Sequence, residues 1–357
     1  MDPNMIPSNR LPGLAQHPRV KLGHHPTPID ELPRLGKELG ITLWAKRDDC
    51  NGLAFGGNKV RQLEYYLGPA AEAGADTMLI TGALQSNFVR LAVASANKLG
   101  MHSEVQLEER VPDTDPLYRS SGNILLDQLL GATIHYFPEG ENEAAADASL
   151  DAHADRLRQD GRKPHVIHLG IDHPPIGAMG YAAAAAECLD QLEAVGQMPD
   201  VVVIPSGSAI THCGFLAGTR VAGWNVPILG VCVRRGADTQ HGRVARRTRE
   251  AVQMLKADVE ISDDDVIVTD AVLAPGYGRM NEAVAEAIRL AAQREALMLD
   301  PVYTGRTMAG LIHMVRSGEI KPGAKVLFIH TGGGPALFAY QDKMAANLAE
   351  LSSVSQH

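Results

Sequence analysis

Several features that mark whole classes of protein are scarce in this sequence. Only 4% of its 357 residues are aromatic and the net charge is −9, so a nucleic-acid surface built on stacking and positive charge is not expected. The two basic clusters, Arg234-Arg235 and residues 246–249, are interpreted as solvated helix faces. No apolar run approaches the about 20 residues of a transmembrane helix, and no membrane span is therefore predicted.

Cysteine is also scarce, and its spacing argues against two kinds of site. The four cysteines are far apart and form no CxxC pair, which disfavours a disulfide framework and a zinc site. The 14 histidines include no HExxH motif, so no metal is expected. Residues Met1–Gly13 lack the apolar core of a signal peptide. Together these absences favour a protein of the reducing cytoplasm.

What the sequence does have is a regular alternation of short apolar runs with longer helical stretches. The expected strands are Thr77–Thr81, Ser103–Leu107, Thr133–Phe137, His165–His168, Val201–Ile204, Pro227–Val233 and Lys325–His330. The expected helices are Arg61–Ala73, Asn87–Leu99, Ser121–Leu130, Ile176–Val195 and Asn281–Leu297. This alternation indicates an α/β fold, with parallel sheets covered by helices on both faces. The acidic stretch Glu139–Asp155 is expected at the surface.

A glycine pair followed by a lysine is the first candidate for chemistry. Gly56 and Gly57 allow a tight backbone approach, and Lys59 follows at the head of a helix. Burial and the positive potential of a helix N-terminus both lower the pKa of an amine. That favours the neutral nucleophile which imine formation with an aldehyde requires. Alone, the motif is equally typical of a turn with a surface lysine.

Two further motifs lie where a predicted strand runs into a helix, which is where parallel sheets collect ligands. Ser86 and Asn87 offer a hydroxyl and an amide there, although both are also good helix N-caps. Residues 205–211, with the sequence PSGSAIT, have small side chains that expose N–H groups to an anion. No GK[ST] or GxGxxG pattern accompanies them, which indicates one phosphate monoester and not a dinucleotide.

Three more pieces complete the set of motifs. They are LAPGYGRMN at 273–281, DPVYTG at 300–305 and HTGGGPA at 330–336. Together and in this order the motifs resemble the fold-type II pyridoxal-phosphate enzymes, and among them the D-cysteine desulfhydrase / 1-aminocyclopropane-1-carboxylate deaminase family. The resemblance runs from the HPTP motif at His25 and the KRDD motif at Lys46 to Tyr340. It implies a two-domain, tryptophan synthase β-like fold, with a small domain of residues 62–171 and a large cofactor-binding domain of residues 1–61 and 172–357.

The resemblance also implies roles for individual residues. In that family the lysine of the GGNK motif, here Lys59, carries pyridoxal phosphate as a Schiff base and is the expected base for the α-proton. Ser86 is expected to face the substrate, and Asn87 to bond the ring hydroxyl of the cofactor. Tyr277 is expected to lie against the cofactor ring, and Tyr303 to reach the substrate. The residues expected to hold the phosphate are Ser206, Gly207, Ser208, Ala209 and Thr211.

Two threonines distinguish the branches of the family. The cyclopropane-opening branch has glutamate at the position of Thr304 and leucine at that of Thr331, whereas the desulfhydrase branch has threonine at both. A neutral hydroxyl stabilises a protonated pyridine nitrogen less than a carboxylate does, so the ring is a weaker electron sink. The resemblance therefore implies β-elimination, with loss of a sulfur group, to pyruvate and ammonia. D-Cysteine, L-cysteate and β-chloroalanine all carry a suitable leaving group.

Three departures from the family pattern fall on the substrate pocket and the phosphate grip. Phe88 stands where the desulfhydrase branch has histidine and the deaminase branch has glutamine. Gln62 replaces a lysine near the phosphate, and Ile210 replaces a glycine. The lost lysine charge is expected to weaken cofactor binding unless another basic group compensates. The stretch 171–174 is closer to the deaminase branch, and the chirality of the substrate stays open.

Other activities compete with this interpretation. They are an aminocyclopropane-carboxylate deaminase, a racemase or dehydratase of a small hydroxy amino acid, and a non-catalytic pyridoxal-phosphate-binding protein. Ser86, Tyr277 and Tyr303 go beyond what cofactor binding needs, which argues against the last. The expected partners are a small amino-acid substrate and, as is usual in the family, a second copy of the chain in a homodimer.

Overall fold

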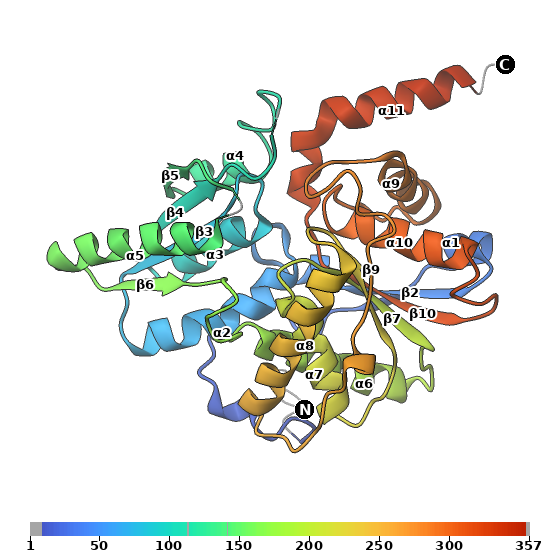
Figure 1. Ribbon diagram of the computed structural model, residues 1–357, viewed down its shortest axis with the longest axis horizontal. Coiled ribbons are helices and arrows are strands. Elements are labelled where there is room, and N and C mark those ends of the chain that lie inside the picture. The colour runs from blue at the N-terminus through green and yellow to red at the C-terminus, as the bar shows by residue number, and fades with distance from the viewer. Residues whose placement is uncertain (1–8, 113, 141, 355–357) are drawn as a thin grey trace.

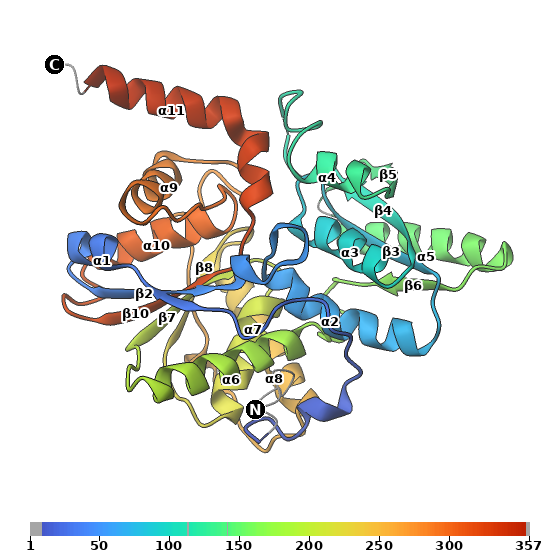
Figure 2. The same cartoon turned by 180° about the vertical axis from the view of Figure 1, so that it is seen from behind.

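The computed structural model describes residues 9–112, 114–140 and 142–354, so the first eight residues of the segment Met1–Gly13 lie outside it. Its strands form two sheets in separate lobes (Figures 1 and 2). The larger sheet has the order β1-β2-β10-β7-β8-β9 and the smaller one the order β5-β4-β3-β6. All neighbouring strands run parallel except β1, which pairs antiparallel with β2. The fold is therefore α/β, as predicted.

The larger lobe is a three-layer sandwich. Its strands are β1 (Ile29–Glu31), β2 (Thr42–Arg47), β7 (Val201–Ser206), β8 (Ile228–Cys232), β9 (Ile267–Thr269) and β10 (Lys325–His330). One face is covered by α1 (Pro33–Leu39), α9 (Glu282–Glu295) and α10 (Thr304–Arg316), and the other by α6 (Ala178–Ala194), α7 (Ile210–Val221) and α8 (Ala237–Met254) (Figure 1). Separate apolar cores fill the two faces, so the central strands are buried on both sides, as parallel sheets require.

The smaller lobe repeats this plan with four strands. They are β3 (Thr77–Ala83), β4 (His102–Glu108), β5 (Thr133–Phe137) and β6 (Pro164–Ile167). The associated helices are α2 (Asn58–Glu72), α3 (Asn87–Lys98), α4 (Asn123–Leu129) and α5 (Glu143–Gln159). Met78 and Ile80 pack in the core with α3, whereas Leu79 packs with α5, because successive strand residues face opposite sides of a sheet. The expected small domain, 62–171, encloses these four strands, and α2 begins four residues before it.

Short and terminal elements complete the chain. They are the 3-10 helices Leu14–Gln16, Asp48–Cys50, Leu53–Phe55, Asp263–Asp265 and Gly334–Tyr340, and the helix α11 (Gln341–Val354). Helix α11 projects away from the larger lobe (Figure 1). None of the helices in the described ranges is long and apolar enough to cross a membrane.

The interpretation of the basic clusters as solvated helix faces is wrong for three of their arginines. Arg234 and Arg235 precede α8, and their side chains are only 8% and 17% exposed. Arg247 is buried because it donates to the carbonyls of Gly170 and His173. A guanidinium can be buried where carbonyl or carboxylate oxygens satisfy its planar set of donors, and these oxygens come from distant parts of the chain.

The acidic stretch, which is expected at the surface, forms a surface helix with one buried side. Helix α5 covers most of it, and Ala146, Leu150 and Ala154 on one side of the helix are buried. Leu150 and Ala154 pack on Leu79 of the smaller sheet.

A buried ion network joins the first turns of α2 to the larger lobe. Arg61 donates to both carboxylate oxygens of Asp48 at 2.9–3.1 Å and to Glu187 of α6 at 2.9–3.0 Å. Lys46 of β2 donates to Glu187 at 2.5 Å. Burial raises the pKa of Asp48, but the attraction of Arg61 outweighs it and the pKa is lowered overall. Because Arg61 follows Lys59 by two residues, this network fixes where the lysine lies.

Replacing Arg61 with leucine should lower the free energy of unfolding by about 3–5 kcal/mol, because it leaves the buried carboxylate of Asp48 without its ion-pair partner and that of Glu187 with Lys46 alone. Urea unfolding followed by far-UV circular dichroism measures this. Arg158→Leu is the matched control: its pair with Asp155 has side chains 52% and 66% exposed, and the change should stay within about 0.5 kcal/mol. Equal shifts in the two variants would show that the network does not hold the fold together.

Candidate active site

A pocket opens between the two lobes, at the carboxyl ends of β3, β7 and β10. Most of the residues predicted from the motifs meet there. Those that line the pocket are Lys59, Ser86, Asn87, Gly207, Ser208, Ala209, Thr211, Tyr277, Tyr303 and Thr331. Ser206 and Thr304 are not among them. The structure thus brings together side chains as far apart in sequence as Lys59 and Thr331, as the rule for parallel sheets predicts.

Lys59 lies in the first turn of α2, at the base of the pocket. The helix begins after Gly57, whose φ of 129° suits glycine and where a Cβ atom would lie 3.0 Å from the carbonyl oxygen of Thr331. The N–H of Asn58 donates to that same oxygen at 3.0 Å. Two loops therefore meet backbone to backbone beside the lysine, which explains the glycines in both.

Burial lowers the pKa of the Lys59 amine to about 8. Its Nζ donates to Oε1 of Gln62 at 3.2 Å and lies 4.9 Å from the centroid of the Phe88 ring. The apolar ring takes the place of water next to the amine and so contributes to its desolvation. A neutral amine is thus accessible near physiological pH, as nucleophilic attack on an aldehyde requires.

The loop before α7 is built to receive an anion. Ala209, which lines the pocket, has a left-handed backbone with φ of 78°, and no described side chain caps the helix that follows. The first N–H groups of that helix are therefore available to an anion. The hydroxyl of Thr211 accepts from Asn58 and Gln62, both at 2.8 Å, which leaves its proton free to be donated. Ile210 packs in the apolar core instead, so this departure from the family pattern leaves the pocket lining unchanged.

Two arginines supply the charge that the glutamine at position 62 lacks. Arg235 donates to the carbonyl oxygen of Gly207 and Arg243 to that of Ser208, each at 3.3 Å. Burial lowers the pKa of Arg235 to about 10, and burial also lowers that of Arg243. Both remain positive at neutral pH and lie behind the anion-binding loop, where they provide the basic groups that a lost lysine would call for.

Ser86 and Asn87 act as helix cap and as pocket lining at once. The hydroxyl of Ser86 accepts from the N–H of Val89 at 3.2 Å, and thereby caps α3. The side-chain oxygen of Asn87 accepts from Nδ2 of Asn123 at 2.9 Å. With their acceptor groups engaged inside the protein, the serine hydroxyl proton and the asparagine amide group are left as donors toward a ligand.

The buried Arg90 holds the hydrogen-bonded pair of Asn87 and Asn123 in place. Arg90 donates to Asn123 at 3.1 Å and to the carbonyl oxygen of Gly56 at 2.9 Å. It therefore links the asparagine pair to the glycine loop that precedes the lysine.

The two predicted tyrosines form a pair on the opposite wall. Their hydroxyl oxygens lie 2.8 Å apart and their rings are T-shaped. Burial raises the pKa of Tyr303, so its hydroxyl stays neutral at physiological pH.

The two diagnostic threonines occupy different environments. Thr331 lines the pocket, and its hydroxyl has no hydrogen-bond partner among the described residues. Thr304 is fully buried behind Tyr303, and its hydroxyl donates to Oδ1 of Asp300 at 2.7 Å. Asp300 also accepts from the backbone N–H of Thr304 and of its two predecessors. Of the predicted ring-nitrogen partners, only Thr331 is therefore presented to the pocket by this structure.

Ser206, the other predicted residue outside the lining, is likewise engaged elsewhere. Its hydroxyl lies 3.1 Å from Nδ1 of His212 and accepts from Gln240 at 2.8 Å.

Two arginines of the pocket were missed by the motif analysis. Arg110 follows β4 and Arg234 follows β8, and both line the pocket. Each stands just past the carboxyl end of a predicted strand, and that position is the signal which could have identified them.

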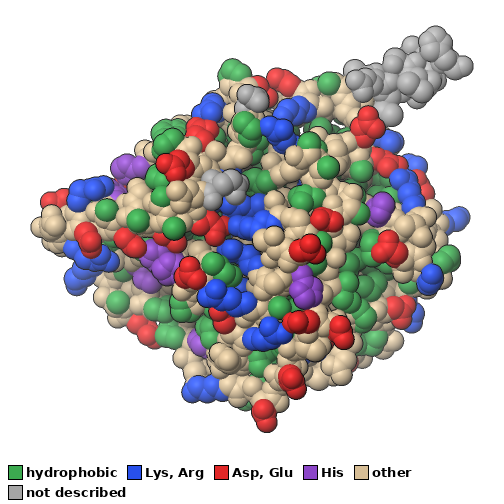
Figure 3. All heavy atoms as spheres, viewed as in Figure 1, with side chains coloured by type: hydrophobic (Ala, Val, Ile, Leu, Met, Phe, Trp, Pro, Cys, Tyr) green, Lys and Arg blue, Asp and Glu red, His purple; other side chains and the backbone are tan. Residues whose placement is uncertain are grey.

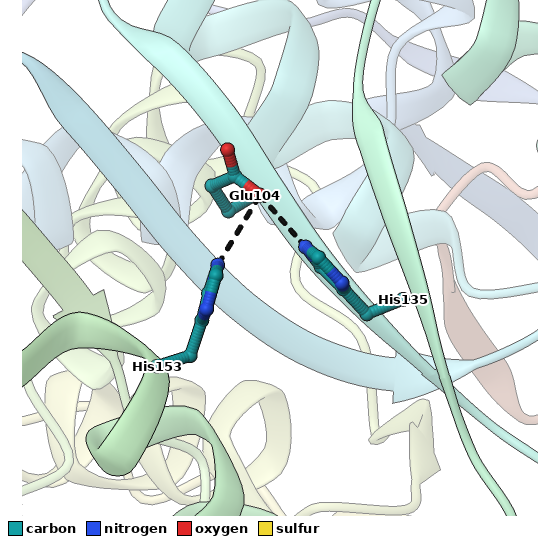
Figure 4. A group of neighbouring side chains, drawn as sticks. All are labelled: Glu104, His135 and His153. Carbon is teal, nitrogen blue, oxygen red and sulfur yellow. Dashed lines mark hydrogen bonds and ion pairs between the residues drawn. The ribbon is translucent and has the colours of Figure 1, made fainter. Parts of the chain in front are cut away.

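A candidate metal-binding group lies outside the pocket, on the smaller lobe. Oε2 of Glu104 is 2.8 Å from Nε2 of His135 and 3.3 Å from Nε2 of His153 (Figure 4). The rings are inclined by 59°, so their lone pairs can converge, and two imidazoles with a carboxylate suit a divalent transition metal. The ligands come from β4, β5 and α5, so no short spacing in the sequence reveals them, and the absence of a metal stays a prediction.

A second group of this kind, Asp147 with His168 and His173, is less suitable. Its two rings are stacked 4.0 Å apart and only 6° from parallel, so their in-plane lone pairs run side by side and do not meet.

The chemistry of the pocket residues fits pyridoxal phosphate. An amine with a lowered pKa suits the aldehyde, an uncapped helix N-terminus with Thr211 suits the phosphate, and the amide of Asn87 and the hydroxyl of Thr331 offer partners to a polar aromatic ring.

Comparisons with known proteins agree with this fit. A family model described as pyridoxal-phosphate dependent enzyme matches residues 20–332. The chain is 38% identical to a 1-aminocyclopropane-1-carboxylate deaminase of Burkholderia vietnamiensis, over 92% of this chain and 98% of the relative. It is 39% identical to a D-cysteine desulfhydrase of Klebsiella pneumoniae, with the same coverage.

Solved structures show the same relationship. A crystal structure described as that of an ACC deaminase homologue superposes with a TM-score of 0.84 at 34% identity, covering 96% of this chain and 100% of the other. A fungal L-serine ammonia-lyase from Rhizomucor miehei, 18% identical, shares the fold with a TM-score of 0.63 over 90% of this chain and 97% of its own.

The lowered pKa of Lys59 predicts how the cofactor-free protein captures pyridoxal phosphate. The fraction of neutral amine rises with pH, so the second-order rate of capture should increase from pH 6.5 and level off above about pH 8. Stopped-flow absorbance measures this rate. Nα-acetyl-lysine, with a pKa near 10.4, corrects for the ionisations of the cofactor itself. A corrected rate that still climbs steeply at pH 10 would contradict the role given to burial.

Proposed function

Because this chain belongs to the family of pyridoxal-phosphate-dependent enzymes, we propose that it is a lyase that eliminates a sulfur group from the β-carbon of a small amino acid. The products are pyruvate, ammonia and the sulfur leaving group. D-Cysteine and L-cysteate are the substrates proposed first. The cofactor is pyridoxal phosphate, which supplies an electron sink for the electron pair left when the α-proton is removed.

The residues of the pocket divide the work of this reaction. Lys59 would hold the cofactor through its amine, and the same amine in its neutral form would take the α-proton of the substrate. Ser86 would donate a hydrogen bond to the substrate carboxylate, and Asn87 would donate one to the ring hydroxyl of the cofactor. Tyr277 and Tyr303 close the other wall, where the neutral hydroxyl of Tyr303 can donate to the departing group.

The observation that carries this choice is the absence of a carboxylate from the described lining of the pocket. Thr331 there offers only a neutral hydroxyl, which stabilises a protonated ring nitrogen poorly. A weak electron sink suffices for a substrate with a good β leaving group, and it disfavours the opening of a cyclopropane. The names of the relatives do not decide between the two reactions, because relatives named for either activity are equally similar to this chain.

We also propose that the enzyme is a cytoplasmic homodimer. Its four cysteines are all free thiols and three of them are buried, which suits a reducing compartment.

Lys59→Ala tests the role of the lysine. The wild-type holoprotein should show a visible absorption band that borohydride abolishes, and the variant should lack it because it has no amine to form the imine. Arg158→Leu, on the surface, should keep the band. Absence of the band in wild type supplied with excess cofactor would overturn the catalytic role of Lys59.

Substrate preference tests the choice of reaction. Pyruvate should form from at least one of D-cysteine, L-cysteate and β-chloroalanine. With 1-aminocyclopropane-1-carboxylate, kcat/KM for 2-oxobutanoate should be at least roughly 100-fold lower, since a barrier higher by about 2.7 kcal/mol gives this ratio. Efficient ring opening would favour the deaminase. No turnover of any amino acid would favour a non-catalytic binding protein.

A further inference from the structure

Two arginines face the pocket from opposite lobes. Arg110 belongs to the smaller lobe and Arg234 to the larger, and both line the pocket that holds Lys59. Figure 3 shows Lys and Arg side chains gathered down the middle of this face, between the parts of the molecule that hold the two sheets. The described lining of the pocket thus has three basic side chains and no acidic one, in a protein whose net charge is −9.

Arg110 is held rigidly by one carboxylate. Its Nε and Nη2 each donate to Glu108 at 2.8 Å, in a bidentate pair. Glu108 is 1% exposed and also accepts from the hydroxyl of Thr81 at 2.8 Å. This arrangement engages one edge of the guanidinium, and Nη1 has no hydrogen-bond partner among the described residues. A planar donor fixed in this way is preorganised for an oxyanion.

Arg234 belongs to a group of three arginines that share Glu143 at the start of α5. Arg235 and Arg243 of this group donate to the backbone of the anion-binding loop. Arg234 lies 3.1 Å from Glu143 and itself lines the pocket. Two members of the group thus lie behind the anion-binding loop, and the third lines the pocket itself.

Two basic side chains of the pocket lining have no role yet in the proposed reaction. The loop and the helix N-terminus would hold the phosphate, with Arg235 and Arg243 behind the loop. Ser86 would hold the α-carboxylate and Asn87 the ring hydroxyl of the cofactor. Arg110 and Arg234 remain, and the described lining holds no carboxylate. Each of the two is paired with a carboxylate of the protein, so neither carries an uncompensated charge. A guanidinium that one carboxylate engages along a single edge, as Glu108 engages Arg110, keeps a donor that suits a second anionic group on the substrate.

We infer that Arg110 and Arg234 form a subsite for an oxyanion on the β-carbon of the substrate, and that this group is a sulfonate. The inference rests on the proposed function and deepens it, because it selects L-cysteate over cysteine. A β-carboxylate is excluded as a leaving group, since it would depart as carbon dioxide without the bonding electrons.

A sulfonate satisfies the chemistry of elimination. The α-proton moves to Lys59, the C–S bond breaks, and both of its electrons leave with sulfur as sulfite. Overall, cysteate and one water molecule give pyruvate, ammonium and hydrogensulfite. O-Phosphoserine carries a related oxyanion, but its dianion would exceed the charge of an arginine that already shares Glu108.

Replacement of Arg110 with glutamine tests the subsite. The ratio of kcat/KM for L-cysteate to that for β-chloroalanine should fall roughly 10–100-fold, the range for loss of a hydrogen bond to a charged group. O-Phosphoserine is assayed alongside. Arg119→Gln is the matched control, because Arg119 pairs with Glu109 at the surface and its loss should leave the ratio unchanged. An equal loss for both substrates would overturn the inference, as would faster turnover of O-phosphoserine than of cysteate.

Arg110 also neutralises the buried Glu108, so its loss has a structural component. The double variant Glu108→Gln with Arg110→Gln removes both charges together and should show the same fall in the ratio. Arg110→Lys keeps the positive charge but not the planar set of donors, and it should recover part of the wild-type ratio. A ratio restored to the wild-type value by the double variant would assign the effect to the unpaired Glu108 and overturn the subsite.

A binding measurement separates the subsite from the reaction. The holoprotein is titrated calorimetrically with 3-sulfopropanoate and with 3-sulfanylpropanoate, which lack the amino group and cannot react. The sulfonate should bind at least 10-fold more tightly, and Arg110→Gln should remove the difference. Equal affinities would overturn the subsite even if the enzyme eliminates sulfur. If the sulfonate binds more tightly in an Arg110-dependent way but no amino acid is turned over, the subsite is supported and the proposed function is overturned.

Discussion

The position of the Lys59 amine depends on the buried ion pairs that Arg61 forms two residues further along α2. Arg61 is held by Asp48 and Glu187, and through them the first turns of α2 are fixed to β2 and α6 of the larger lobe. From the other side, Arg90 holds the carbonyl of Gly56, and Gly57 packs on Thr331. Lys59 therefore has little freedom to move, which is what a group that must hold a cofactor and then transfer a proton requires.

Several polar side chains of the pocket have two functions: they bond within the protein and they keep a donor for a ligand. Ser86 caps α3 and Asn87 is held by Asn123, yet each keeps a donor for a ligand. Thr211 accepts two hydrogen bonds from α2 and keeps its proton for the anion. Side chains whose acceptors are satisfied within the protein present donors only, and a pocket of donors suits a ligand made of phosphate and carboxylate groups.

Much of this arrangement was predictable from the sequence, because it follows from local rules. Apolar runs located the central strands, and the strand ends located the serine–asparagine pair and the anion-binding loop. The glycine pair at the head of a helix located the lysine. Strands β1, β2 and β9 were missed because they are short or lack a distinctive pattern, and β1 is the one antiparallel strand.

What could not be predicted depends on contacts between distant segments. Arg247 is buried because carbonyls from residues 170 and 173 meet it. Thr304 and Thr331 look equivalent as motif positions, but Asp300 binds the first of them and removes it from the pocket. Arg110 and Arg234 line one pocket only because the two lobes face each other, which no local sequence pattern indicates.

The sharing of Glu143 has a consequence for the protein as a whole. This residue begins α5 of the smaller lobe, while its three arginine partners belong to the larger lobe. Burial raises the pKa of Glu143, but the arginines outweigh it and the pKa is lowered, so the link persists in mildly acid solution. It is partly open to solvent, with Glu143 27% exposed, and dissolved salt therefore weakens it. Ionic strength thus acts on one of the contacts that join the two lobes of the enzyme.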